Sequence, residues 1–289
     1  MTAPDPASHR PAVVGAGVMG STIATLALGH GLPVVLVDVD QEKVERARGQ
    51  IAQSLRHAGL LSALPDDRPA GELKITTSIG DIAGATVVIE AVTETFAAKH
   101  EALSAISEVV PPGTPLVSNT SGIPIGELAA VLPRPADLVG THFMNPAYLI
   151  TMVELARAPR TAESTVTAVK DLLAALDRKA TVVRDSPGFV TSRLLHPMIN
   201  DAARLVDEGV ATAEEVDALM RGCLGHPTGP LRTADLIGLD NLVDSLVALH
   251  ERTGEERYRP CALLLAKVKD DHLGRKTGRG FYDYGKVLS

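Results

Sequence analysis

The sequence predicts an α/β fold, in which a parallel sheet is doubly wound with helices and is followed by an all-helical domain. Three observations support this prediction. Short apolar segments alternate with helical patterns through the first part of the chain, a glycine-rich turn joins the first such pair, and the pattern beyond residue 186 is helical. The length of 289 residues and the hydrophobic content of 45% suit two globular domains.

The predicted strands of the first domain are short apolar runs that end in turn residues. They cover residues 11–15, 34–38, 86–90, 115–118, 138–141 and 180–184. Residues 21–29 are apolar at helical spacing, with Gly29 and Gly31 suited to end a helix, and residues 41–58 form a charged helical segment. Strands that are apolar throughout and separated by helices indicate a parallel sheet covered on both faces.

The pattern changes at Pro187, where strands give way to helices. Residues 190–208 form one long helical segment, and Thr212 with Glu215 three residues later is typical of a capped helix start. Helices are also predicted over residues 240–249 and 260–269, and strand-like alternation returns only at residues 280–284. The long helix carries an apolar stripe of Leu194, Leu195, Met198, Ile199 and Leu205. The chain is therefore divided into domains of residues 1–186 and 187–289.

Composition argues against several classes of protein. The net charge of −7 disfavours a general nucleic-acid binder. No stretch reaches the roughly 18 apolar residues of a membrane span, and the first ten residues lack the apolar run of a secretory signal. Cys223 and Cys261 have no metal-ligand spacing. We expect no nucleic-acid or membrane partner, no metal, no disulfide, and a reducing cytoplasmic setting.

A glycine motif indicates a dinucleotide site. Gly15, Gly17 and Gly20 form a GxGxxG between a predicted strand and a predicted helix. In this motif the first glycine permits the tight turn, the second lets the backbone approach a pyrophosphate, and the third lets helix and strand pack closely. Asp38 lies 18 residues beyond Gly20 at the end of the next strand, where a carboxylate can accept hydrogen bonds from ribose hydroxyls and repel a 2′-phosphate. The expected cofactor is therefore NAD.

One histidine is placed to act as a base. His142 follows the strand predicted over residues 138–141, and histidine titrates near neutral pH. Glu154 lies 12 residues later among apolar neighbours, where a carboxylate needs a partner. Pairing would fix the imidazole tautomer and stabilise the imidazolium. The spacing alone also allows a core histidine or a structural ion pair.

Further motifs extend along most of the chain. They are GAGVMG at 15–20, EAVTE at 90–94, SNTSGIPI at 118–125, THFMNP at 141–146, DSPGFVTSRLLHPMINDA at 185–202, HPTGPLRTADLIGLD at 226–240 and GRKTGRGFYDY at 274–284. With these motifs the chain resembles the L-3-hydroxyacyl-CoA dehydrogenases, which include 3-hydroxybutyryl-CoA dehydrogenases. The resemblance implies an NAD-dependent oxidation of the 3-hydroxyl of a short acyl thioester, on a Rossmann-type domain followed by a helical domain.

The resemblance also implies the roles of individual residues. His142 would be the base, Glu154 its partner, and Ser121 a hydrogen-bond donor to the substrate. The residues implied to bind NAD are Gly15, Gly17, Val18, Met19, Gly20, Asp38, Glu94, Lys99, Asn119 and Asn145, and those implied to contact substrate are Ser54, Asn145 and Ser192. The resemblance further implies a homodimer that forms through the helical domain and a substrate site between the two domains.

Two departures from the family bear on the substrate. The PGF segment usually continues with Val-Asn-Arg, and here Ser192 replaces the asparagine that reaches the substrate. The helix after Asp38 keeps Ser54 and Arg56 but carries apolar residues such as Leu61 in place of a lysine cluster that contacts the phosphates of CoA. The loss of phosphate contacts and the apolar surface beside Arg56 favour an acyl carrier protein as the carrier. The segment THFMNPAYLI at 141–150 also resembles a subgroup of the family that acts on carrier-bound units in polyketide extender-unit synthesis, and this resemblance implies a glyceryl-type substrate.

Three alternatives remain open from the sequence. The first is a 3-hydroxybutyryl-CoA dehydrogenase of acyl-CoA metabolism. The second is a dehydrogenase of free hydroxy acids or sugar acids on the same scaffold, and the third is a non-catalytic NAD-binding protein. The combined presence of Ser121, His142 and Glu154 argues against the third. Reduction of NAD with a short 3-hydroxyacyl thioester would separate the first alternative from the other two.

Overall fold

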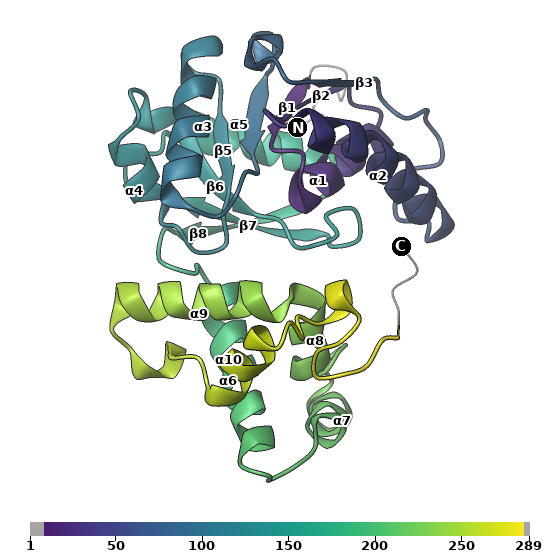
Figure 1. Ribbon diagram of the computed structural model, residues 1–289. Coiled ribbons are helices and arrows are strands. Elements are labelled where there is room, and N and C mark those ends of the chain that lie inside the picture. Colours follow the sequence, from purple (N-terminus) through teal and green to yellow (C-terminus); the bar gives the residue numbers. More distant parts are fainter. Residues whose placement is uncertain (1–8, 286–289) are drawn as a thin grey trace. The chain divides into compact units, whose positions relative to one another are not determined.

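The computed structural model describes residues 9–285 and divides the chain into two compact units, Met1–Phe189 and Val190–Ser289 (Figure 1). The sequence places the boundary at residue 186, whereas the first unit continues to Phe189. The reason is packing, because the Phe189 side chain is only 3% exposed and belongs to an apolar cluster of the first unit. We describe each unit by itself.

The first unit is built on one sheet of eight strands in the order β3-β2-β1-β4-β5-β6-β7-β8. The strands are β1 (Pro11–Val14), β2 (Val34–Val37), β3 (Leu73–Thr76), β4 (Val87–Glu90), β5 (Leu116–Asn119), β6 (Leu138–His142), β7 (Met152–Arg157) and β8 (Lys179–Arg184). The predicted α/β class is confirmed, and β3 and β7 are additions to the predicted strands. The sheet is mostly parallel rather than wholly so, because β7 runs antiparallel to β6 while β8 is parallel to β7.

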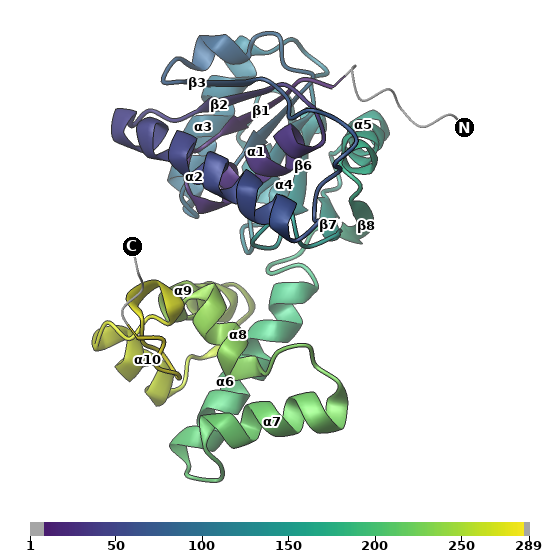
Figure 2. The ribbon, with the colours of Figure 1, turned by 90° about the vertical axis from the view of Figure 1, so that its right-hand side faces the viewer.

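Helices cover both faces of this sheet. They are α1 (Val18–Gly29), α2 (Gln41–Leu60), α3 (Phe96–Val109), α4 (Ile125–Ala130) and α5 (Glu163–Ala175). Apolar side chains of α1, α2 and α5 form one core with the sheet, and those of α3 and α4 form a second core on the other face. Figures 1 and 2 show α1 and α2 lying side by side. The predicted helical segments 21–29 and 41–58 are parts of α1 and α2, and α3, α4 and α5 are additions.

The second unit is helical in its described residues. Its helices are α6 (Thr191–Asp207), α7 (Ala213–Leu224), α8 (Pro230–Ile237), α9 (Leu239–Thr253) and α10 (Ala262–Lys269). The predicted capped start is confirmed at α7, where the Thr212 hydroxyl accepts from Glu215 N and the Glu215 carboxylate accepts from Thr212 N. Buried side chains from all five helices form a single apolar cluster.

The predicted stripe on α6 is in fact two adjacent stripes. Ile199 is fully buried in the core of the unit, and Leu195 packs against that core. Leu194 and Leu205 are instead 63% and 41% exposed. Since positions separated by 4 and 7 residues share one side of a helix, Leu194, Met198 and Leu205 form the second, outward stripe.

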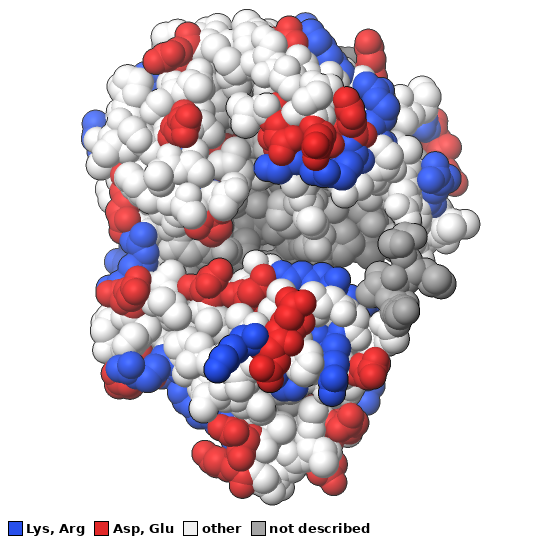
Figure 3. Space-filling view, viewed as in Figure 1, with Lys and Arg blue, Asp and Glu red and all other residues white. Residues whose placement is uncertain are grey.

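The last described segment is not a strand. Residues 280–284 make only isolated bridges, and they are held by Asp235, whose carboxylate accepts from the backbone N–H groups of Phe281 and Tyr282. None of the helices in residues 9–285 combines the length and the apolar character that crossing a membrane requires. On the visible face of each unit, acidic and basic side chains occur side by side (Figure 3).

Candidate active site

Several predicted site residues of the first unit lie at strand ends near the point where the strand order of the sheet reverses. From β1 the chain moves outward to β2 and β3, and it then returns to β4 on the other side of β1. Ligands of open α/β sheets bind at the carboxyl ends of the strands beside such a point. Gly15 follows β1, Asp38 follows β2, Glu94 follows β4, Asn119 ends β5 and His142 ends β6.

The three glycines of the first turn have different surroundings. Gly15 has a φ of +108°, and a Cβ there would lie 2.5 Å from the carbonyl oxygen of Ala91. A Cβ on Gly20 would lie 1.8 Å from the carbonyl oxygen of Gly15, so both positions exclude a side chain. At Gly17 a Cβ would meet no protein atom within 4 Å. Gly17 therefore presents bare backbone to open space, as the approach of a pyrophosphate requires.

The start of α1 and Asp38 complete a site that fits NAD. Gly17 provides no side-chain cap, and the first turn of α1 holds no acidic residue, so backbone N–H groups and the positive end of the helix dipole favour an anion there. The buried Asp38 carboxylate accepts from Ala16 N at 2.8 Å and from Asp40 N at 3.0 Å. It has further lone pairs for ribose hydroxyls. Val18 is exposed on the first turn, and Met19 packs against the core.

His142 and Glu154 lie directly opposite each other in the sheet. They are register partners of the antiparallel pair β6–β7, and His142 Nδ1 is 3.0 Å from Glu154 Oε2. The side chains are only 12% and 9% exposed. The ring of Phe189 lies edge-on to the imidazole, with a centroid distance of 6.3 Å. The hairpin thus explains how residues 12 apart in sequence form a pair.

This geometry determines the tautomer of the imidazole. A carboxylate only accepts hydrogen bonds, so Nδ1 carries the proton that is shared with Glu154. In the neutral ring Nε2 then holds the lone pair that can accept a proton from an alcohol. The imidazolium formed by this transfer lies beside a largely buried negative charge that stabilises it. The arrangement therefore supports general-base chemistry.

Ser121 lies in the loop after β5 and is held by Glu94. Glu94 Oε1 accepts from Ser121 N at 2.9 Å and from Gly122 N at 3.2 Å, and the Ser121 hydroxyl is 3.4 Å away. Thr120 Oγ1 also donates to this oxygen. Burial opposes ionisation of Glu94, but the ammonium of Lys99 and these hydrogen bonds outweigh it and lower the pKa of the carboxyl group. A negatively charged Glu94 therefore fixes the backbone around Ser121.

Lys99 has surroundings that differ from those expected of a cofactor ligand. Its side chain is completely buried, and Nζ lies 2.9 Å from Glu90 Oε1 and 3.2 Å from Glu94 Oε2. The same ammonium donates to the carbonyl oxygen of Asn119 at 3.2 Å. The physical reason is the fully buried Glu90, which needs a cation because burial raises its pKa even though Lys99 acts in the opposite direction. Lys99 thus contacts protein oxygens from three segments.

The remaining predicted residues have different positions. Asn119 Oδ1 accepts from Phe143 N at 3.1 Å, which joins the end of β5 to the residue after His142. Asn145 is exposed in the loop between β6 and β7, and the half-buried Ser54 lies on α2. Ser192 belongs to the second unit, near the start of α6, and is 2% exposed. The first unit therefore joins Glu94, Lys99, Ser121 and Asn119 in one network that reaches the residue beside His142.

Several residues of this region carry no role in the sequence prediction. Glu90 holds Lys99 and accepts from the Ser118 hydroxyl at 2.6 Å, and its signal in the sequence was a carboxylate at the end of the apolar run Val87–Glu90. Arg178 contacts the loop after His142, Tyr148 lies in that loop, and neither belongs to a pattern that sequence spacing could identify. In residues 9–285 no three His, Cys, Asp or Glu side chains are grouped closely enough to hold a metal ion.

Comparison with known proteins identifies relatives over nearly the whole chain. Residues 11–186 match the model of the NAD binding domain of 3-hydroxyacyl-CoA dehydrogenase, and residues 188–284 match the model of its C-terminal domain. The chain is 42% identical over 281 residues to a probable 3-hydroxybutyryl-CoA dehydrogenase of Bacillus subtilis, which covers 96% of this chain and 98% of the relative.

Solved structures give the same picture. The (S)-3-hydroxybutyryl-CoA dehydrogenase PaaH1 of Ralstonia eutropha is similar with a TM-score of 0.86 and 38% identity, covering 96% of this chain and 99% of the relative. FadB2 of M. tuberculosis is similar with a TM-score of 0.91 and 38% identity over the same shares of the two chains. Sequence and structure therefore point to one family over both units.

Proposed function

The chain belongs to the 3-hydroxyacyl-CoA dehydrogenase family and is an NAD-dependent oxidoreductase that acts on CH–OH groups, and from this premise we propose that its substrate is a short 3-hydroxyacyl-CoA such as 3-hydroxybutyryl-CoA. The product would be the 3-oxoacyl thioester. The observation that carries the proposal is the contact of 3.0 Å between His142 Nδ1 and Glu154 Oε2, because it prepares the opposite imidazole nitrogen as a base.

In the proposed mechanism the residues of the first unit act on the 3-hydroxyl group. When NAD is bound, it supplies the acceptor for the hydride that leaves C3. His142 Nε2 accepts the hydroxyl proton, and Glu154 stabilises the imidazolium that results. Ser121 is fixed by Glu94 so that its hydroxyl can hydrogen-bond a substrate oxygen. Asp38 and the bare backbone at Gly17 would hold the adenosine ribose and the pyrophosphate.

The test of this function measures NADH formation with 3-hydroxybutyryl-CoA. We expect turnover by the wild type, and a loss of about 100-fold or more in kcat for His142→Ala with nearly unchanged affinity for NAD, since a general base contributes about 10²–10⁴-fold. His250→Ala is the matched control, because His250 also faces a carboxylate, with 3.9 Å between its Nε2 and Glu256 Oε1. A His142→Ala variant that kept more than about a tenth of the kcat would rule out the base.

The choice of CoA over a carrier protein rests on the relatives. The sequence favours an acyl carrier protein because the lysine cluster after Asp38 is missing. Two of the similar proteins named above, however, are a probable 3-hydroxybutyryl-CoA dehydrogenase and an (S)-3-hydroxybutyryl-CoA dehydrogenase, and both match this chain over nearly their full length. In the structure Leu60 and Leu61 are 85% and 51% exposed at the end of α2, beside the exposed Arg56. Arg46 lies 3.4 Å from Glu42, so part of the basic charge of this helix is compensated.

A direct comparison decides between the two carriers. The same 3-hydroxybutyryl group is presented on CoA and on an acyl carrier protein, and the two values of kcat/KM are measured. We expect the CoA thioester to be the better substrate. A higher kcat/KM for the carrier-bound group would instead support the hypothesis of a carrier-bound extender unit. In that case kcat/KM should fall with added salt, because salt screens exposed charge pairs.

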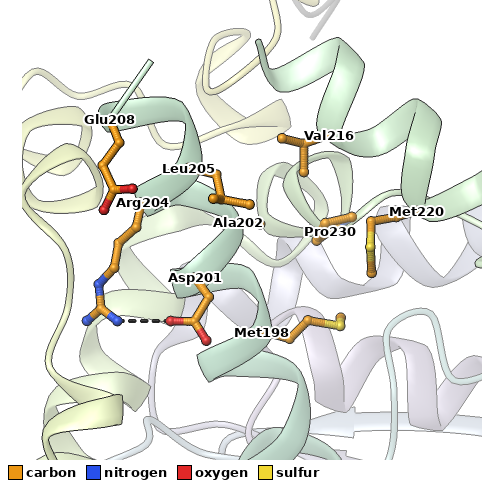
Figure 4. Close-up of a pocket in the computed structure, with 9 residues that line it drawn as sticks. All are labelled: Met198, Asp201, Ala202, Arg204, Leu205, Glu208, Val216, Met220 and Pro230. Carbon is orange, nitrogen blue, oxygen red and sulfur yellow. Dashed lines mark hydrogen bonds and ion pairs between the residues drawn. The ribbon is translucent and has the colours of Figure 1, made fainter. Parts of the chain in front are cut away.

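We also propose that the protein is a homodimer formed through its second unit. Figure 4 shows a groove between α6, α7 and α8 in which Met198, Leu205 and Met220 present apolar surface. Asp201 and Arg204, which pair at 2.9 Å, lie along one side. Large apolar side chains continue outside the groove on α7, where Leu219 is 60% and Leu224 is 66% exposed. Exposed apolar surface of this kind marks an interaction site, and a second copy supplies matching surface.

Mass measurement in solution tests the homodimer. The wild type should have twice the mass of one chain, and Met220→Glu should shift the population toward monomer. Val131→Glu is the control, because Val131 is 47% exposed on the first unit. A wild type that is monomeric at micromolar concentration would contradict the homodimer. The cytoplasmic location also remains a proposal, supported by two free cysteines, the exposed Cys223 and the buried Cys261.

A further inference from the structure

The loop that follows His142 is long and is held at its middle by one side chain. Nine residues, 143–151, connect β6 to β7, and the loop includes the exposed Asn145. Arg178 donates from Nε to the carbonyl oxygen of Ala147 at 3.2 Å and from a terminal nitrogen to that of Tyr148 at 2.9 Å. Its other terminal nitrogen donates to the carbonyl oxygen of Asp177 at 3.1 Å. Each nitrogen of the guanidinium thus binds a main-chain carbonyl.

Arg178 is an unusual residue to hold a loop, because it is charged and only 6% exposed. Burial lowers the pKa of the guanidinium, against the opposing effect of Asp177. A buried cation is costly unless hydrogen bonds satisfy it, so the three carbonyl contacts are needed to keep it in place. The planar fork of arginine fixes two neighbouring carbonyls at once, which the single ammonium of lysine cannot do.

The fold aims Arg178 at this loop through the end of α5. Asp177 adopts a left-handed backbone with a φ of +52°, and Arg178 N donates to the carbonyl oxygen of Leu173 at 2.7 Å. This is the pattern of a helix that ends in a Schellman turn. The next residue, Lys179, is the register partner of Met152 and donates to the carbonyl oxygen of Thr151 at 2.8 Å. The chain therefore reaches the loop just before β7 begins.

A second contact holds the same part of the loop. The buried Tyr148 places its hydroxyl 3.1 Å from His57 Nδ1 on α2, with the two rings edge to face at a centroid distance of 6.2 Å. The start of the loop is fixed separately, where Phe143 N donates to Asn119. The segment between these anchors contains Asn145, and its position depends on where Ala147 and Tyr148 are held.

We propose that Arg178 is a positioning residue of the dehydrogenase reaction. By fixing the carbonyls of Ala147 and Tyr148 it sets the path of the loop, and through the loop it sets the positions of Asn145 and of the His142 ring relative to the substrate. The proposal rests on the function proposed above. Its chemical requirement is a fork of two parallel N–H donors at this position and not a positive charge alone.

The experiment compares Arg178→Lys and Arg178→Met with a matched control, Arg134→Met. Arg134 also donates from two nitrogens to two carbonyl oxygens, those of Val110 and Ser107, at 3.1 and 3.0 Å. It precedes β6 and so lies at the opposite end of that strand from His142. The measurements are kcat, KM for NAD, KM for 3-hydroxybutyryl-CoA and the melting temperature.

All three variants should lose thermal stability, but only the Arg178 variants should lose kcat, by about tenfold or more, since a displacement of about 1 Å in a catalytic site can cost about 100-fold. Arg178→Lys should be nearly as slow as Arg178→Met. A fourth variant, Arg178→Ala, removes the guanidinium and leaves space for it, and guanidinium ion added to this variant should recover part of the kcat. A kcat for Arg178→Lys within twofold of the wild type, or an equal loss for Arg134→Met, would overturn the proposal.

A readout without turnover separates this proposal from the proposed function. The rate at which diethyl pyrocarbonate modifies His142 is followed by mass spectrometry in the wild type, Arg178→Lys and Arg134→Met. Arg178→Lys should change this rate at least threefold and Arg134→Met should leave it unchanged. If the wild type oxidised no 3-hydroxyacyl thioester but the rate still changed, the proposed function would fail while the positioning of His142 stood. An unchanged rate in Arg178→Lys would refute the positioning.

Discussion

Replacement of Glu154 by glutamine tests the proposed catalytic pair of His142 and Glu154, because it exchanges one carboxylate oxygen for an amide nitrogen. Glutamine has the size of glutamate, so the packing around this 9% exposed side chain should be retained. Its amide oxygen can accept from His142 Nδ1 and preserve the tautomer, but it carries no charge to stabilise the imidazolium. A hydrogen bond to a charged group contributes about 1.5–3 kcal/mol. At about 1.4 kcal/mol for each factor of ten, kcat should fall by about 10- to 150-fold.

The Glu154→Gln variant has a second possible outcome, which the size of the loss in kcat distinguishes from the first. If the amide turned its nitrogen toward His142, it would donate to Nδ1 and force the proton onto Nε2, which is the wrong tautomer for a base. The loss would then approach about 10⁴-fold. Glu154→Asp is the companion variant, since it keeps the charge but withdraws it by one methylene. Its kcat should lie between those of the wild type and Glu154→Gln if the charge matters more than the contact.

The assay is a double-mutant cycle in kcat, with NAD affinity measured alongside. Glu154→Gln should cost nothing further once His142 is already alanine, because the charge acts only through the imidazole. Affinity for NAD should be unchanged in every variant of the cycle. If Glu154→Gln reduced kcat as much in the His142→Ala background as in the wild type, Glu154 would not act through His142. The contact between the two residues would then have no role in catalysis.

Three further predictions concern the cofactor, acid stability and the substrate. Asp38→Ala should reduce the preference for NAD over NADP in kcat/KM by about tenfold or more, since one charged hydrogen-bond acceptor is lost; an unchanged ratio would contradict the role of Asp38. Burial opposes ionisation of Glu94, but the effects of Lys99 and Thr120 are larger and lower the pKa of the Glu94 carboxyl group. The ionised carboxylate therefore stabilises the fold above the ordinary pKa of glutamate, and this stabilisation is lost as the pH falls through the lowered pKa. Glu94→Gln should therefore lower the melting temperature at neutral pH, and this difference should shrink in acid; a difference independent of pH would refute it. Ser192→Asn should lower KM for 3-hydroxybutyryl-CoA by about 2- to 10-fold, the effect of one neutral hydrogen bond, and a KM that does not fall would mean that the amide has no substrate contact here.

The sequence predicted the elements whose patterns are local. The strands around residues 12–14 and 35–37 are apolar throughout, and the capped start at Thr212 needs only the glutamate three residues later. The glycine turn was equally readable, because the bare approach at Gly17 and the tight packing at Gly20 depend on residues next to each other in the chain. Local patterns therefore predicted the fold class and the glycine turn at which we propose that NAD binds.

Features that depend on distant segments could not be predicted in this way. Lys99 occurs in an ordinary helical pattern, and only the adjacency of β4 and β5 shows that its ammonium is surrounded by oxygens of Glu90, Glu94 and Asn119. Arg178 is similar, since a basic residue after a helix usually lies in solvent. Both are charged side chains that can be buried because main-chain or carboxylate oxygens accept hydrogen bonds from them. Sequence spacing does not predict these contacts.

The antiparallel direction of β7 connects the local sequence pattern around His142 with the distant contact made by Arg178. Only nine residues separate β6 from β7, and a parallel β7 would need a crossover of a dozen or more. The short connection therefore brings β7 back beside β6 and sets Glu154 opposite His142, which is how a separation of 12 residues becomes a contact of 3.0 Å. A connection of nine residues is nevertheless longer than a tight hairpin turn, and its backbone N–H and C=O groups need hydrogen-bond partners. Arg178 provides them at the middle of the loop, so the direction of β7 that brings Glu154 to His142 also creates the need for the buried guanidinium.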